Sequence, residues 1–484
     1  MRNTIILWLF IPFLFSFRSD ASRSEYILPM AAYSIDTADL DMDGDIDIVT
    51  GHLRNWQTNW SGLSIMKNLG DGNFYLEDSL YFYGWQNVLC AQLDTIPFPE
   101  IIFKKETLST EFIGILYNND YADSLFLNTN KNNGIEYYAT GDIDNNGYND
   151  ILFASNQGLY WGVFYNFGHH NFSLPQYHYV TGYYPSATAC GDLNGDGRDD
   201  VVIGGQKVEV YYSLPGGFQK EVLQWNTYMD LLAVTDFDGD GDNDLLTAGL
   251  GHSLIMYRNL DDTSLQVLPA VNTVQDHMAF SVKDFNNDLL PDIAFLSYFP
   301  DTAGSGMTDT IGGIYLFYNQ GNFQLSGAQF ISLINYHEGG RNFQSADLDG
   351  NGYNDFAVIR GMGIQMKNLE LLFNDGNGNF TGTPVGMTHR ENNARTTNLK
   401  CFPNPFHQNT TFEFDLEHSE QVELSIYDIR GNFVQVLIND MKKEGHYSIS
   451  FSGYHHAGIQ EIGTFLACLK INGKICQSIK ITRF

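Results

Sequence analysis

The chain has 484 residues, of which 43% are hydrophobic and 17% charged, so it is long enough for two or more domains with apolar cores and is not a disordered chain. Asp and Glu number 57 against 26 Lys and Arg, and the formal net charge of −31 disfavours binding to nucleic acid or to anionic membrane surfaces. The aromatic content of 14% and the 47 glycines favour an all-β protein with many turns.

The N-terminus has the features of a signal peptide over residues 1–21. Arg2 supplies a positive charge, residues 5–17 are apolar except for Ser16, and Ser19 and Ala21 offer small residues for cleavage. The apolar run is shorter than the roughly 20 residues that span a bilayer, and no later segment approaches that length. We therefore expect export, with no transmembrane anchor in the mature chain.

An acidic nine-residue motif organises residues 22–387. The pattern D-x-[DN]-x-[DN]-x-x-x-D occurs six times, and an eroded seventh copy begins at Gln92. The number of residues from the start of one copy to the start of the next is close to the length of one propeller blade. Each unit also contains an apolar run that ends in a residue with an amide or hydroxyl side chain, as at Asn68 and Ser213. Seven copies predict a seven-bladed β-propeller, with the acidic loop between the first and second of four strands. The complete copies start at Asp39, Asp142, Asp192, Asp236, Asp284 and Asp347.

The residue types of this motif are those that bind calcium. Ca²⁺ takes six to eight oxygen ligands, and side chains at alternate positions of a tight loop can converge on one point. We expect ligands from the side chains at positions one, three, five and nine and from the carbonyl at position seven, with Gly at position six allowing a sharp turn. The predicted ligands are Asp39, Asp41, Asp43, Asp45 and Asp47; Asp142, Asp144, Asn146, Tyr148 and Asp150; Asp192, Asn194, Asp196, Arg198 and Asp200; Asp236, Asp238, Asp240, Asp242 and Asp244; Asp284, Asn286, Asp288 and Asp292; and Asp347, Asp349, Asn351, Tyr353 and Asp355.

Other interpretations of the motif fit less well. The loops contain no His or Cys, which zinc and copper prefer. An EF-hand or dockerin shares the opening of the motif but needs helical flanks and an acidic residue at position twelve, which here is apolar or Thr. One copy alone would be a solvated turn, whereas six aligned copies predict about six structural calcium sites. Ile96, Pro97 and Phe98 fill the eroded copy, which predicts no ion there, and Leu289 in place of Gly predicts a weaker site in the Asp284 copy.

These repeats resemble the FG-GAP family, also called VCBS-like, whose blades build the integrin α-subunit head. The resemblance covers roughly residues 30–385, and the acidic loops are its most specific part. It implies a β-propeller in which the intact loops bind calcium on the lower face.

A second resemblance covers the end of the chain. After a polar linker over residues 388–397 comes the sequence CFPNPF at residues 401–406. It is followed by runs in which apolar and polar residues alternate, and by a turn at Asn472 and Gly473. This pattern predicts a small immunoglobulin-like β-sandwich over residues 398–484. The segment resembles the type A C-terminal sorting domain of the Bacteroidetes type IX secretion system. The resemblance implies that the secretion machinery is a partner, that the domain is removed, and that the product is secreted or attached to the outer-membrane surface.

Candidate ligand-binding residues lie on loops and strand starts far from the acidic motif. Trp56, Trp60 and Trp85 are suited to stacking on sugar rings. Glu136, Asp230, His277 and Arg341 lead into the innermost strands, where they could converge near the mouth of the central channel. We favour a non-catalytic adhesion or glycan- or protein-binding module, with no catalytic residues assigned. The alternative is a carbohydrate-active enzyme, a polysaccharide lyase or hydrolase, on the same scaffold.

Overall fold

The structure is a computed structural model, and it describes residues 24–382 and 399–483 apart from short gaps. The predicted signal peptide and the predicted linker lie outside the described residues. Among the described residues, no helix has the length and apolar character needed to cross a membrane. The gaps are residues 54–59, 71, 84–86, 97, 107–109, 118–119, 132–133, 181–182, 224–227, 250–252, 261–263, 274–276, 302–308, 334–339, 361–367, 405, 408, 417, 429–432, 453–462 and 472–473.

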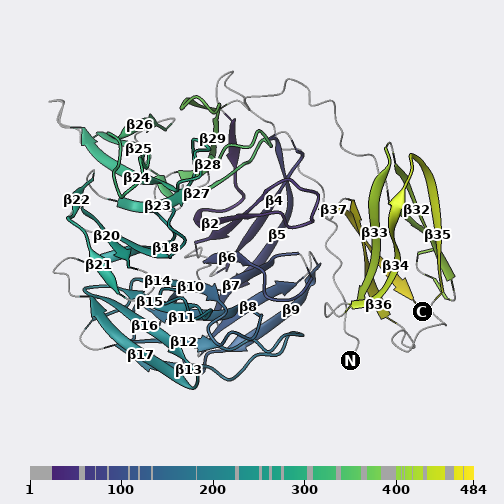
Figure 1. The fold of residues 1–484 in the computed structure, drawn as a ribbon, viewed down its shortest axis with the longest axis horizontal. Helices are drawn as coiled ribbons and strands as arrows, with labels where there is room; N and C mark the ends of the chain where they lie inside the picture. Colours follow the sequence, from purple (N-terminus) through teal and green to yellow (C-terminus); the bar gives the residue numbers. More distant parts are fainter. Residues whose placement is uncertain are drawn as a thin grey trace, which may run out of the picture.

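Seven antiparallel sheets follow one another along the described part of the chain and form a ring (Figure 1). In six of them the strand order in the sheet follows the chain, from the innermost strand outward. The blades are β2 (Ala32–Ala38), β3 (Asp47–His52), β4 (Trp60–Asn68) and β5 (Phe74–Tyr83); β6 (Val88–Ala91), β7 (Glu100–Glu106), β8 (Glu111–Tyr117) and β9 (Asp120–Asn128); β10 (Ile135–Gly141), β11 (Asp150–Ser155), β12 (Tyr160–Phe164) and β13 (Gln176–Tyr179); β14 (Ala187–Gly191), β15 (Asp200–Gly204), β16 (Val208–Leu214) and β17 (Gly217–Leu223); β18 (Met229–Thr235), β19 (Asp244–Gly249), β20 (Ser253–Asn259), β21 (Leu265–Val267) and β22 (Val271–Asn272); and β23 (His277–Lys283), β24 (Asp292–Asp301), β25 (Asp309–Phe317) and β26 (Gln329–Ser332).

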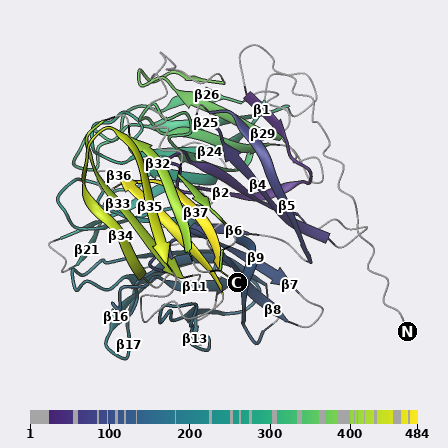
Figure 2. The ribbon, with the colours of Figure 1, turned by 90° about the vertical axis from the view of Figure 1, so that its right-hand side faces the viewer.

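The seventh blade contains strands from both ends of the ring. Its inner strands are β27 (Gly340–Ala346), β28 (Asp355–Arg360) and β29 (Asn368–Asn374), and its outer edge is shared by β30 (Phe380–Thr381) and β1 (Ser24–Ile27). Strand β1 pairs antiparallel with β29, with Glu25 opposite Glu370, and the two strands lie side by side in Figure 2. The inner strands β27 and β2 also pack against each other, so the ring is closed.

Burial between neighbouring blades explains the sequence of the second strands. Every residue of β3, β11, β15, β19 and β28 is buried, as expected for strands covered by a sheet on each face. The apolar clusters join adjacent blades rather than single sheets. For example, Ile48 and Met66 of the first blade pack in one cluster with Ala357 and Leu369 of the seventh. The propeller core is therefore a series of inter-blade layers.

The C-terminal domain is a sandwich of two antiparallel sheets. One contains β31 (Lys400–Phe402), β32 (Asn409–Leu416) and β35 (Gly445–Ser452), and the other contains β34 (Phe433–Lys442), β33 (Glu420–Asp428), β36 (Gly463–Ile471) and β37 (Lys474–Arg483). Along β32, Phe412, Phe414 and Leu416 alternate with residues that are exposed or half-buried, and all three are buried in the core shared by both sheets.

Candidate metal-binding loops

Each acidic motif forms the turn between the innermost strand of a blade and the second strand. In the first blade, Asp39 follows the last residue of β2 and Asp47 is the first residue of β3. The predicted sharp turn at position six is confirmed by positive φ angles, between 81° and 101°, at the glycines there. Leu289, which replaces Gly in the sixth blade, has a φ of 73°, so a non-glycine residue holds the same left-handed conformation. The glycines at this position are Gly44, Gly147, Gly197, Gly241 and Gly352.

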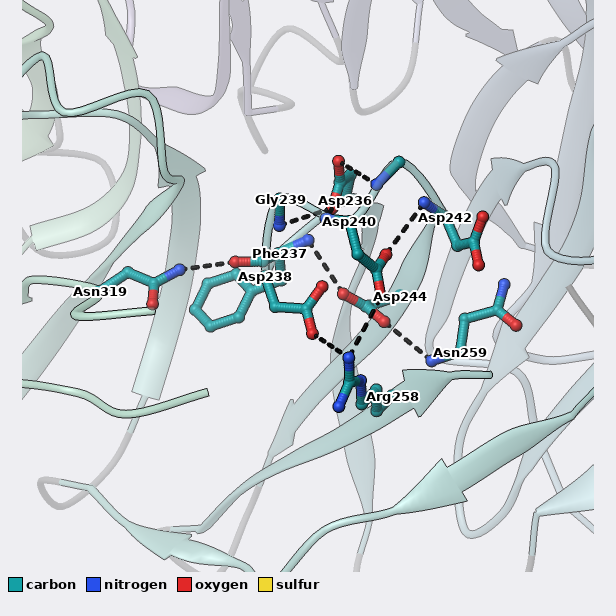
Figure 3. Close-up of polar contacts among 11 residues, drawn as sticks. Asp236, Phe237, Asp238, Gly239, Asp240, Asp242, Asp244, Arg258, Asn259 and Asn319 are labelled. Atoms are coloured by element: carbon teal, nitrogen blue, oxygen red, sulfur yellow. Dashed lines mark hydrogen bonds and ion pairs between the residues drawn. The ribbon is translucent and has the colours of Figure 1, made fainter. Parts of the chain in front are cut away.

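Backbone N–H groups shape each loop around its carboxylates. In the fifth blade, Gly241 donates its N–H to Asp236 Oδ2 at 3.0 Å, and Asp242 donates to Asp240 Oδ1 at 3.1 Å (Figure 3). The same bonds, from position six to position one and from position seven to position five, recur in the other five loops. The side chains at positions one and five therefore face the inside of the turn, as ligands of a common ion would.

The carboxylate at position nine joins the loop to the third strand. Asp244 Oδ2 accepts the N–H of Phe237 at 2.9 Å, and its Oδ1 accepts the N–H of Asn259 at 2.8 Å. All six loops repeat this pair of bonds, and the aspartates at this position are at most 1% exposed. Sequence reasoning assigned these residues only as ligands. They also satisfy two buried backbone donors, a role that requires a carboxylate with or without an ion.

In five of the blades, the asparagine at the end of the third strand links the blade to the preceding one. Asn319 Nδ2 donates to the carbonyl of Pro291 in its own loop at 3.1 Å. It also donates to the carbonyl of Phe237 in the preceding blade at 2.7 Å (Figure 3). The recurrence of this amide was visible in the sequence, but its function as an inter-blade clasp was not. Ser213 has a shorter side chain and bonds only the carbonyl of Asp199 in its own loop. The equivalent clasps are made by Asn68, Asn166, Asn259 and Asn374.

Position eight adds a second link between loops of adjacent blades. Asn243 Nδ2 donates to the carbonyl of Asp192, the first residue of the preceding loop, at 3.0 Å. Asn149 and Asn354 make the same bond to the first residue of the loop before them. At Asp199 the direction of the hydrogen bond is reversed, because its Oδ2 accepts the N–H of Asp142, the first residue of the preceding loop, at 2.8 Å. Four of the loops are thus tied to the preceding loop.

Four loops bring three carboxylates within 4.8 Å of one another, close enough to hold one metal ion. The other two have Asn at position three, Asn194 or Asn286, and so offer fewer charges. The donor set fits a hard cation, because it consists of oxygens alone. Asp238 is a direct sign of this fit: its side chain is 3% exposed and its buried Oδ1 has no hydrogen-bond partner. The four groups are Asp39, Asp41 and Asp43; Asp142, Asp144 and Asp150; Asp236, Asp238 and Asp244; and Asp347, Asp349 and Asp355.

Two of these groups also contact a basic side chain from the third strand. Arg258 lies 3.0 Å from Asp238 and 3.2 Å from Asp240 (Figure 3). Lys67, which precedes Asn68 as Arg258 precedes Asn259, lies 3.1 Å from Asp41 and is buried. These cations reduce the net negative charge of the first and fifth loops. The predictions from sequence set only the Asp284 loop apart and missed this difference.

Burial raises the pKa of the position-nine carboxyls. Desolvation raises the pKa of Asp150 and of Asp355 to about 8, and that of Asp200 to about 7. At Asp47, the pKa is raised by burial to about 6, while the charge of Lys67 acts in the opposite direction. Neighbouring carboxylates contribute to the rise, so a bound cation would favour the charged forms.

The eroded loop of the second blade keeps a carboxylate bond at position nine but has a different interior. Glu100 stands at position nine, and its Oε2 accepts the N–H of Leu93 at 2.6 Å. Ile96 and Phe98 are buried at the centre, where the sequence predicts no ion. His170 reaches this loop from the third blade, with its Nε2 3.5 Å from Asp94 Oδ2.

The structure describes the predicted ligand-binding residues less completely than the acidic loops. Trp56 and Trp85 lie outside the described residues. Trp60 begins β4, His277 begins β23 and Arg341 is the second residue of β27, but their side chains are not among those described.

The structure does bring together two acids that the sequence placed at the channel mouth. Glu136 and Asp230 line one cavity of about 410 Å³, to which all the innermost strands contribute. The cavity lies among the first residues of those strands, whereas the acidic loops follow their last residues. Asp39 comes six positions after Tyr33, which lies at the cavity, and this corresponds to roughly 20 Å at about 3.3 Å per residue.

The fold and the loops together define a β-propeller built from acidic-loop repeats. The family described as FG-GAP-like repeat matches residues 142–203 and 236–295, and the family described as secretion system C-terminal sorting domain matches residues 400–459. The chain thus carries FG-GAP-like repeats and a type IX C-terminal sorting domain, and the sorting domain indicates export to the cell surface or the extracellular space.

The solved structures that match this chain have little sequence in common with it. A crystal structure of BBS1N in complex with ARL6DN, soaked with mercury, is 10% identical, covers 72% of this chain and 95% of its own, and has a TM-score of 0.49. The lead-soaked form of that complex is 9% identical, covers 71% of this chain and 92% of its own, and has a TM-score of 0.46. Sqt1 of Saccharomyces cerevisiae is 11% identical over 73% of this chain and 99% of its own, with a TM-score of 0.47. No curated protein sequence matches the chain.

Proposed function

We propose that the protein is an exported, calcium-stabilised β-propeller that binds a glycan or protein ligand at the cell surface without catalysing a reaction. The observation that carries this proposal is the separation of two features along the innermost strands. Acidic loops follow the ends of these strands, and the channel cavity lies among their starts. Ions would therefore hold the scaffold, while the opposite end of the channel is available to a ligand.

Calcium fits the loops as a structural ion. The side chains at positions one, three, five and nine would hold it, and its charge would offset the repulsion between carboxylates that lie within 4.8 Å of one another. Because ligands from both sides of the turn converge only in the folded state, binding would stabilise the fold by mass action. The six intact motifs would provide about six sites, with the weakest in the Asp284 loop.

Calcium titration of the mature protein tests the scaffold role. We expect the melting temperature to rise with calcium up to millimolar concentrations, to fall with chelator, and to respond less to magnesium, which prefers to keep its water ligands. The double substitution D142N/D144N, which leaves the Asp150 carboxylate in place, should remove one site from the stoichiometry measured by calorimetry. A melting temperature that is the same with chelator and with calcium would contradict the scaffold role.

Glycan arrays and surface-protein pull-downs with the calcium-loaded protein test the binding role. The runner-up function, a polysaccharide lyase or hydrolase, draws on the presence of Glu136 and Asp230 in one cavity. Turnover of a polysaccharide that is lost in E136Q and D230N would favour the enzyme, whereas binding without turnover favours the proposed module.

A further inference from the structure

A β-bulge recurs at the start of the innermost strands. The register against the second strand shifts between Ala32 and Ser34 in β2, and equivalent shifts occur in β10, β18, β23 and β27. In each case the extra residue is the second of its strand. Bulges redirect side chains and are frequent beside functional sites. The residues at the bulges are Tyr33, Glu136, Asp230, Met278 and Arg341.

The cavity in the channel lies at the level of these bulges. Tyr33, Glu136 and Asp230 line it, and its volume of about 410 Å³ is within the range of small-molecule sites. Thr188 lines the cavity from β14, the strand between those of Glu136 and Asp230. Three consecutive blades therefore contribute residues with side-chain oxygens to its lining.

The charged residues of the described lining are acidic. Glu136 and Asp230 are its only charged members among the described residues, and Tyr33 and Tyr137 add aromatic rings. Asp230 Oδ1 and Thr188 Oγ1 are buried atoms without a hydrogen-bond partner, which is costly unless a ligand or water supplies one. Acceptors and π-faces around a partly enclosed space are suited to a positively charged donor group.

We propose that this cavity binds an organic cation, an ammonium or guanidinium group, between Glu136 and Asp230. The inference rests on the proposed binding role and names the chemistry of its ligand. The cation is carried either by a small free amine or by a basic side chain of a partner. In both cases the charged group enters from the end of the channel opposite the acidic loops.

A matched pair of small probes tests the charge requirement on the full mature protein with calcium present. Butylguanidinium and butylurea have the same shape and differ in charge. We expect calorimetry to show binding of butylguanidinium that is at least about tenfold tighter than that of butylurea, as one charge-assisted contact would give. A blocked pentapeptide with a single Arg among glycines distinguishes the sources, since only a site that admits a partner's side chain binds it.

Conservative variants locate the site. D230N and E136Q should each weaken butylguanidinium binding by roughly tenfold, whereas E221Q, which removes an exposed carboxylate on the outer strand β17, should leave it within about twofold. Melting curves establish that the variants are folded. Equal affinity for the two probes, or undiminished binding by D230N, overturns the proposal. Glycan or protein binding that persists in both channel variants also overturns it and leaves the proposed binding role intact.

Discussion

The ammonium of Lys67 lies 2.9 Å from Oδ2 of Asp47, the position-nine carboxylate of the first loop. It also lies 3.1 Å from Asp41, and its side chain is 2% exposed. A basic group therefore occupies part of the space between carboxylates that would otherwise face a metal ion alone. The first loop combines a protein cation with its candidate metal site.

Removing this cation should make the first loop depend more on calcium. In K67M the carboxylates of Asp41 and Asp47 lose their partner, so we expect a lower melting temperature in chelator. Calcium affinity at this loop should rise by roughly tenfold or more, because one charge at about 4 Å contributes on the order of 1 to 4 kcal/mol near a protein surface. K220M is the control, since Lys220 pairs with Glu209 away from the loops. An unchanged melting-temperature gain on adding calcium would contradict this interpretation.

The clasp made by Asn319 should be required for stability. N319A removes both bonds donated by a 2% exposed side chain, leaves the carbonyls of Phe237 and Pro291 without that donor, and also removes the Oδ1 that accepts the N–H of Gly321. We expect a loss of about 2 to 4 kcal/mol, because each unsatisfied buried group costs roughly 1 to 3 kcal/mol. Denaturant unfolding measures the change. N377A, at an exposed turn where the amide bonds only Asp375, should have a small effect, and equal losses in the two variants would refute the clasp.

The sequence predicted what repeats locally and missed what depends on distant partners. Gly241 could be assigned its turn because position six of every motif needs the same backbone conformation. The Asn319 amide was seen as a recurring mark, but its partner Phe237 is 82 residues away. Strand β1 carries no motif, so its pairing with β29 had no local signal. The bulges at Glu136 and Asp230 likewise follow from register between strands rather than from residue type.

The metal-free protein should lose stability as pH rises from about 4 to about 8. The pKa of Asp355 is raised by burial from 3.8 to about 8 and that of Asp244 to about 6, so the folded state holds protons that the unfolded state has released in this range. Their contribution to stability is present below the unfolded pKa and is lost as pH rises through the folded values. Melting curves in chelator at pH 5 and pH 8 test this. Saturating calcium should flatten the dependence, and a metal-free protein that is more stable at pH 8 would contradict it.

Tyr26 should contribute to ring closure. It lies on β1 in the seventh blade, its hydroxyl accepts the N–H of Phe74 in the first blade at 3.0 Å, and the two rings pack edge to face at 6.1 Å. We expect Y26A to cost about 3 kcal/mol and Y26F about 1 kcal/mol in denaturant unfolding, since the second change removes only the hydroxyl. Y184A removes an exposed tyrosine and serves as the control. A Y26A loss no larger than that of Y184A would show that this contact does not hold the ring.

Among the six complete loops, Leu289 is the only residue at position six that is not glycine. Its φ of 73° is unfavourable for a side chain with a Cβ, and its side chain is 90% exposed, so packing returns little. L289G should therefore raise stability by roughly 0.5 to 1 kcal/mol, the relief of strain being partly offset by the greater freedom of glycine in the unfolded chain. Calcium affinity at the Asp284 loop should rise as well. The reciprocal change G241A, at a φ of 101° with open space around the new Cβ, should cost about 1 kcal/mol through the backbone alone. A lower melting temperature for L289G in calcium would show that Leu289 contributes a contact that outweighs its strain.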